Sequence, residues 1–144
     1  MRLKTMTSVF ALSAFTALAG CASNSPEQQT PYQRVAGTYE GVLPCPDCAG
    51  IRTQLEIRNQ DNIAASYDLK STRLGKSNEP MVNKGTVLVL EDVGPNDYPV
   101  VYQLKGPDGS DIYNLLPLGN GDLQLLDRNF TKVQSNNDLT LKRR

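Results

Sequence analysis

The sequence predicts an all-β protein, namely a small antiparallel meander β-barrel of about eight strands. First, several short segments alternate apolar and polar residues with the period of two that strands require. Second, the connectors between them are rich in Gly, Pro, Asn and Asp, and no window shows a helical period with caps. Closing such a meander into a barrel removes its exposed edges. A two-sheet sandwich would show the same periodicity and is the alternative.

The chain begins with a segment typical of a bacterial secretory signal. Arg2 and Lys4 precede an apolar stretch over residues 6–18, which is shorter than the ~20 residues that a membrane-spanning helix needs. The stretch ends in Leu-Ala-Gly-Cys, residues 18–21, which resembles the bacterial lipobox. This resemblance implies that residues 1–20 are a lipoprotein signal peptide and that Cys21 is diacylated and becomes the N-terminus. The alternative is an ordinary signal peptide.

Acyl chains on Cys21 would anchor the protein to a membrane. Each buried methylene contributes ~0.8 kcal/mol, and two or more chains hold a protein stably. Residue 22 is Ala rather than the Asp that retains many enterobacterial lipoproteins at the inner membrane. We therefore expect a cell-envelope protein anchored in the outer membrane, facing the periplasm or exposed on the cell surface.

Composition narrows the possible functions. The chain has 144 residues, and cleavage before Cys21 leaves one domain's worth. Loss of Arg2 and Lys4 leaves 13 basic and 15 acidic side chains, which argues against a nucleic-acid partner. The chain contains no histidine, the commonest general base and transition-metal ligand. We therefore expect no enzymatic activity.

The predicted elements follow the chain in order. Residues 21–33 are polar and contain two prolines, which predicts a flexible tether between the lipid anchor and a barrel domain at 34–144. Residues 51–57 and 63–69 alternate strictly around a turn at 59–62, which predicts a hairpin with Ile63 on its inner face. The other predicted strands are 35–43, 86–92, 98–104, 111–118, 122–127 and 138–143.

Three further features of this region have simple interpretations. Residues 71–84 predict a long loop, and the acidic clusters at 108–111 and 120–122 predict hairpin turns rather than calcium sites. Apolar side chains that face inward would form a packed core, or else line the pocket of a carrier for a small hydrophobic ligand. These inward positions include Tyr39, Ile51, Leu55, Tyr67 and Leu125.

The main chemical candidate is the pair Cys45 and Cys48, in the stretch Leu-Pro-Cys-Pro-Asp-Cys. If Cys21 is lipidated, these are the two remaining thiols in an oxidising compartment, so a disulfide is expected. It would close a very short loop and contribute only roughly 2 kcal/mol in the chain-entropy model. It would stiffen the crossing between two strands.

Two other interpretations of Cys45 and Cys48 stay open. As reduced thiolates they suit Cu(I), which is soft and tolerates few ligands, with Met81 as the thioether that could assist. A redox catalyst is the third interpretation. Catalytic pairs of this spacing usually begin a helix, whereas this one lies between predicted strands, and Asp47 disfavours a nearby thiolate.

Residues 37–57 contain a specific motif. The segment GTYEGVLPCPDCAGIRTQLEI resembles the signature of NlpE-type copper-resistance lipoproteins, in which a G-x-Y-x-G-x-L-P-C-x-x-C-x-G-I strand-loop-strand opens the N-terminal domain. The C-terminal segment 123–143 is similar to the closing segment of the same family, and the middle of the chain matches in pattern only.

The resemblance implies a lipocalin-like barrel on an outer-membrane lipid anchor. It also implies roles in copper tolerance, surface-contact sensing and envelope-stress signalling, with a sensor of the Cpx two-component pathway as the partner. Copper would be held by Cys45 and Cys48. Longer members carry a second, OB-like domain with its own cysteines, and the present sequence matches the first barrel.

Overall fold

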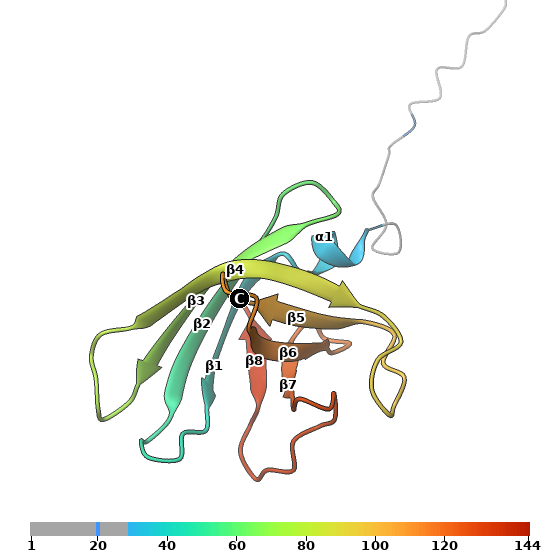
Figure 1. Ribbon diagram of the computed structural model, residues 1–144. Coiled ribbons are helices and arrows are strands. Elements are labelled where there is room, and N and C mark those ends of the chain that lie inside the picture. The colour runs from blue at the N-terminus through green and yellow to red at the C-terminus, as the bar shows by residue number, and fades with distance from the viewer. Residues whose placement is uncertain (1–19, 21–28) are drawn as a thin grey trace, which may run out of the picture.

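In the computed structural model, eight strands form one closed antiparallel barrel in which every strand pairs with the next one along the chain (Figure 1). The structure describes residue 20 and residues 29–144. The strands are β1 (Gly37–Leu43), β2 (Ile51–Asn59), β3 (Ala65–Arg73), β4 (Met81–Leu90), β5 (Val101–Lys105), β6 (Asp111–Pro117), β7 (Leu123–Leu126) and β8 (Thr140–Arg143). The fold class and the meander order are confirmed, and the sandwich alternative is wrong.

A short helix, α1 (Pro31–Val35), precedes the barrel, although no helix was expected and residues 21–33 were predicted to be tether. Thr30 caps it: the Thr30 side chain accepts from the Gln33 amide, and the Gln33 side chain accepts from the Thr30 amide. Tyr32 and Val35 pack against the barrel core. The last residues of the predicted tether therefore belong to the folded domain, while residues 21–28 lie outside the described part of the chain.

Strand β4 corrects the long loop predicted at 71–84. Strand β3 continues to Arg73 and β4 begins at Met81, so that the loop spans only 74–80. Residues 81–85 pair with β3 alone, because β5 joins β4 only from Thr86 onward. This half of β4 buries few side chains, which explains why its sequence lacks a period-two pattern.

The barrel interior is filled by large side chains. Tyr39, Leu55 and Tyr67 are fully buried, and Ile51 and Leu125 pack against them from partly buried positions, as predicted. The expectation for Ile63 is wrong, since 75% of this residue is exposed. Strand β3 begins only at Ala65, so Ile63 lies in the turn.

A second apolar cluster covers the outer face of β5, β6 and β7. Val101, Leu116 and Leu126 form its buried centre. The last residue of β4 and residues of the neighbouring loops pack over it, namely Leu90, Val93, Tyr98 and Phe130. Because β5 and β6 are thus buried on both faces, their sequences are apolar runs rather than alternating patterns.

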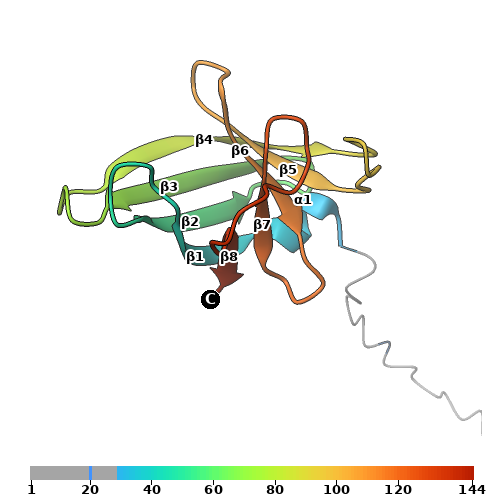
Figure 2. The same cartoon turned by 90° about the horizontal axis from the view of Figure 1, so that it is seen from below.

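Arg143 joins the two ends of the barrel domain. Strands β1 and β8 lie side by side where the barrel closes (Figure 2). Their register covers only two residue pairs, Tyr39 with Arg143 and Glu40 with Lys142. The Arg143 guanidinium donates to the carbonyls of Arg34 and Ala36 and to the Tyr39 hydroxyl, and lies over the Tyr39 ring. The Tyr39 hydroxyl in turn donates to the carbonyl of Val35 at 2.8 Å. This set of contacts holds α1, β1 and β8 together.

In the described part of the chain, residue 20 and residues 29–144, no helix is both long enough and apolar enough to cross a membrane.

Gly85 lets β4 approach β5 closely. Tyr67 lies opposite Gly85 in the β3–β4 register, and its hydroxyl donates across β4 to the carbonyl of Lys105 at 3.1 Å. A Cβ atom on residue 85 would lie 1.9 Å from that carbonyl oxygen and 3.1 Å from the Tyr67 ring. Only glycine therefore fits at this crossing.

We expect Gly85→Ala to lower the free energy of unfolding by about 3 kcal/mol, the upper part of the range for overpacked sites, since backbone must move. Urea denaturation measures the change. The matched control is Gly119→Ala, where nothing lies within 4 Å of the added carbon. The control should change stability by less than about 0.5 kcal/mol. Equal stability of the two variants would contradict the close approach.

Candidate functional site

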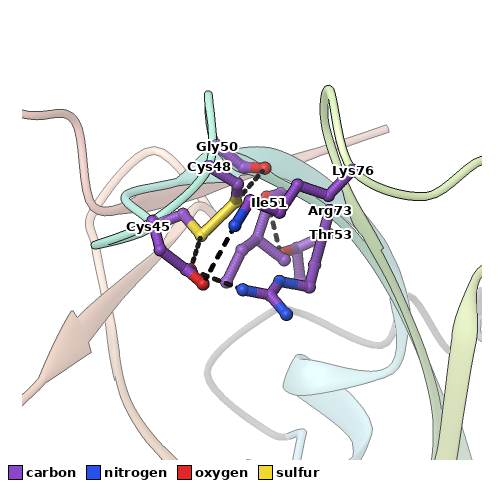
Figure 3. Close-up of a disulfide and its surroundings, with 8 residues drawn as sticks. Cys45, Cys48, Gly50, Ile51, Thr53, Arg73 and Lys76 are labelled. Carbon is purple, nitrogen blue, oxygen red and sulfur yellow. Dashed lines mark hydrogen bonds and ion pairs between the residues drawn. A yellow bond between two sulfur atoms is a disulfide. The ribbon is translucent and has the colours of Figure 1, made fainter.

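The candidate site is the loop of residues 44–50, which joins β1 to β2 (Figure 3). Leu43 pairs with Ile51, so that this loop closes the hairpin at the end of β1 away from α1. Cys45 and Cys48 form a disulfide within it. The expected pairing is thus present. The disulfide crosslinks the loop only to itself.

Each sulfur faces an oxygen acceptor. The Sγ atom of Cys45 lies 3.3 Å from Oδ1 of Asp47, and the Sγ atom of Cys48 lies 3.3 Å from the Gly50 carbonyl oxygen. Both cysteines are half-buried. If the disulfide were reduced, each thiol would have an acceptor at hydrogen-bonding distance for sulfur.

Asp47 connects this loop to the β3–β4 hairpin. Its Oδ1 atom accepts from the Arg73 guanidinium, and its Oδ2 atom lies 3.3 Å from Nζ of Lys76. The Arg73 hydrogen bond, followed by that of Lys76, lowers the pKa of the Asp47 carboxyl from its ordinary value. From the sequence, Asp47 is expected only to repel a nearby thiolate. The two cations could not be predicted, because they come from a distant strand and its loop.

The backbone supports the same connection. The Ala49 amide donates to the carbonyl of Leu74 at 3.2 Å, and the Leu74 amide donates to the carbonyl of Gly50 at 2.9 Å. Gly50 has a φ of +152°, and a Cβ atom there would lie 2.6 Å from a methyl group of Val42. A glycine is therefore needed to return the loop to β2.

The donor atoms of the loop are close enough to share one ion. The sulfur atoms of Cys45 and Cys48 and a carboxylate oxygen of Asp47 lie within 4.8 Å of one another. Two thiolates suit a soft ion such as Cu(I), whereas the ion-paired carboxylate is a harder ligand. Met81 is exposed on β4, with β3 between that strand and β2, so it is not part of this cluster. The residues fit a two-sulfur site once the disulfide is reduced.

The two acidic clusters are turns. The amide of Ser110 donates to Oδ1 of Asp108 at 3.1 Å, and the amide of Asp122 donates to Oδ1 of Asn120 at 3.0 Å. Each side chain thus closes its own turn between strands, which is the common use of Asp and Asn in hairpins.

A second candidate is a groove at the opposite end of the barrel, with a volume of about 840 Å³. Helix α1, the loop before β5 and the turn after β6 form its walls. The lining is mostly apolar and includes Pro99, Val100, Leu118 and Leu123, with Arg34 and Arg143 as its charged residues. No local pattern predicts this groove, because its walls come from segments that are far apart along the chain. Cys21, the predicted lipidation site, lies outside the described residues.

A titration of the Asp47 carboxyl tests whether Arg73 and Lys76 bind it in solution. We expect Arg73→Gln to raise this pKa toward the ordinary value, and Lys76→Gln to raise it less, because Arg73 makes the larger contribution. A pH titration of the side-chain carboxyl signal by NMR measures both. In the wild type the contribution of Asp47 to stability is fully present above its unfolded-state pKa and is lost as the pH falls through the lowered value.

Arg52→Gln, on the exposed face of β2, is the control for that titration. It removes a guanidinium that makes no ion pair with a described residue. A rise in the Asp47 pKa of equal size in all three variants would show a general charge effect and would contradict the specific ion pairs.

Two solved structures are similar to this chain. A crystal structure of a candidate lipoprotein from Shewanella oneidensis matches 83% of this chain and 95% of its own, with 27% identity and a TM-score of 0.53. The crystal structure of the Cpx pathway activator NlpE from Escherichia coli matches 74% of this chain, with 23% identity and a TM-score of 0.49. The present chain covers 50% of that longer protein. No curated protein matches the chain.

The family is identified by the sequence of the barrel itself. The model of the NlpE N-terminal domain matches residues 39–136, which is more than half of the chain and includes the Cys45–Cys48 loop. The resemblance inferred from the strand-loop-strand motif is thereby confirmed, and the protein belongs to the family of NlpE N-terminal domains.

Proposed function

We propose that this protein is a non-enzymatic lipoprotein of the outer membrane, anchored through Cys21, that takes part in envelope-stress signalling and copper homeostasis. The observation that carries the proposal is the family match over residues 39–136. The likeness to a candidate lipoprotein over 95% of that chain supports the lipid anchor. An envelope-stress sensor of the Cpx type is the proposed partner, and sensing of surface contact is a further role within the same proposal.

The structure of the loop supports a binding role rather than catalysis. The pair Cys45 and Cys48 lies between two strands, whereas the pair of this spacing in thiol oxidoreductases begins a helix. The cations nearest to the loop, Arg73 and Lys76, are already paired with Asp47. A nucleophilic thiolate would therefore gain little from them.

Copper capture would require the reduced loop. A dithiol reductant would transfer two electrons and two protons to the disulfide and would itself become a disulfide. The resulting thiols of Cys45 and Cys48 would bind Cu(I) as thiolates and release their protons to solvent. Asp47 would stay on Arg73 and Lys76, since its hard oxygen gains little from a soft ion.

A Cu(I) titration of the reduced protein tests the copper role. We expect one ion per chain, with binding at least about tenfold weaker in Cys45→Ser, because a hydroxyl is a poor ligand for a soft ion. Ala49→Ser is the matched control, since it adds a hydroxyl to the same loop at an exposed position and keeps both sulfurs. Unchanged binding in Cys45→Ser would remove the copper role from the proposal.

A cell-based assay tests the signalling role separately. Overproduction of the full chain should activate an envelope-stress reporter, and a Cys21→Ser variant, which cannot be acylated on sulfur, should activate it less. A Cys45→Ser/Cys48→Ser strain, challenged with copper beside a deletion strain, shows whether the two roles share the loop. A silent reporter with correctly acylated protein would overturn the signalling role.

The second candidate function is that of a carrier for a small hydrophobic ligand. The groove beside α1 favours it, because about 840 Å³ lies within the ~300–1,000 Å³ range of small-ligand pockets. Native mass spectrometry of the protein purified from cells measures this directly. A bound lipid is the expected result, and the mass of the bare protein would count against a carrier.

A further inference from the structure

We propose that the groove beside α1 binds a single-chain fatty-acid anion, with its carboxylate at Arg34 and Arg143 and its acyl chain along the apolar wall. This inference deepens the carrier function and rests on it. It assigns to the groove a class of ligand, the direction in which the ligand lies and the site of its head group. The family match specifies none of these.

The two arginines have charge available for an anion. Among residues 29–144, no carboxylate oxygen lies within 4.0 Å of either guanidinium, whereas seven such ion pairs form elsewhere. Asp122 contacts Arg143 only through the backbone: its Oδ1 atom accepts from the Arg143 amide. Its Oδ2 atom accepts from the Asn120 side chain. Asp122 does not line the groove. The lining of the groove therefore carries two positive side chains and no negative one, although the charge of Asp122 also reaches Tyr39.

The geometry of Arg143 leaves donors for a carboxylate. Its Nη1 atom donates to the Arg34 carbonyl and to the Tyr39 hydroxyl, and its Nη2 atom donates to the Ala36 carbonyl. A guanidinium has five N–H groups. The Nε hydrogen and one Nη2 hydrogen thus have no acceptor among the described residues. Arg34 uses none of its guanidinium hydrogens within the same part of the chain.

The rest of the lining suits an acyl chain. Leu116 and Leu123 are buried residues of the lining, and Pro99, Val100 and Pro117 add further apolar surface. Tyr39 and Tyr102, which line the groove near α1, stay neutral. Burial raises the pKa of both hydroxyls, to about 12 for Tyr102, and these hydroxyls donate to the carbonyls of Val35 and Pro31. No acidic side chain of the described residues lines the groove. One anionic head beside an apolar wall is the chemistry of a fatty acid.

An NMR titration of the full chain carrying Cys21→Ser tests the inference, with decanoate and decanol as the two probes. Decanoate should give saturable shifts of the amides of Arg34, Val100, Gly119 and Gly121, which line the groove. Arg34→Gln should weaken decanoate binding about fivefold, consistent with one partly exposed charged contact. Arg143 is left unchanged because it joins α1, β1 and β8. Arg52→Gln, outside the groove, should bind as the wild type does.

The two probes separate this inference from the carrier function. If decanol binds as well as decanoate and Arg34→Gln has no effect, the groove binds neutral ligands. The carrier function then stands, and the inference that the groove binds a carboxylate is overturned. If neither probe shifts the groove amides at concentrations where both stay monomeric, the carrier function and the inference both fail. Shifts confined to other surfaces would also overturn the site.

Discussion

The barrel depends on one side chain at its seam. Because β1 and β8 share only two residue pairs, backbone pairing alone gives a weak closure, and the Arg143 side chain adds contacts with α1 and Tyr39. A planar guanidinium suits this position, since it can donate to several acceptors while its face lies on an aromatic ring. A lysine could not make the same set of contacts. Without this seam, two strand edges would be exposed to other chains.

The opposite end of the barrel is held in a different way. There the Cys45–Cys48 loop is bound to the β3–β4 hairpin by the ion pairs of Asp47 and by two backbone hydrogen bonds with Leu74. The disulfide stiffens the loop, and these contacts place it. The placement should therefore survive reduction of the disulfide, since neither the Leu74 bonds nor the Asp47 pairs involve sulfur.

Most of the fold could be predicted because strands with one buried face carry a visible period. The hairpin of β2 and β3 is the clearest case, with Leu55 and Tyr67 inside and charged residues outside. The first half of β4 could not be predicted, because it extends past β5 and buries neither face well. Helix α1 was missed for another reason: five residues are too few for a period, although the Thr30 and Gln33 spacing of a capping box was visible.

The candidate site, like the fold, could be predicted from the sequence only in part. The cysteine pair and its position between strands follow from local sequence, whereas Arg73 and Lys76 reach Asp47 only through the register of β2 with β3. Arg34 and Arg143 are likewise 109 residues apart and meet only when the barrel closes. Local patterns contain no information on such pairs, because tertiary structure alone brings them together.

The direction of β1 places the two candidate sites at opposite ends of the barrel. The strand runs from α1 to the loop of Cys45 and Cys48, and its seven residues span about 23 Å at the usual rise of a strand. If the protein is anchored by its N-terminal segment, as proposed above, the groove with Arg34 and Arg143 would lie at the end of the barrel where that segment enters, and the disulfide would lie at the opposite end. The loop of Cys45 and Cys48 would then be the end open to a partner.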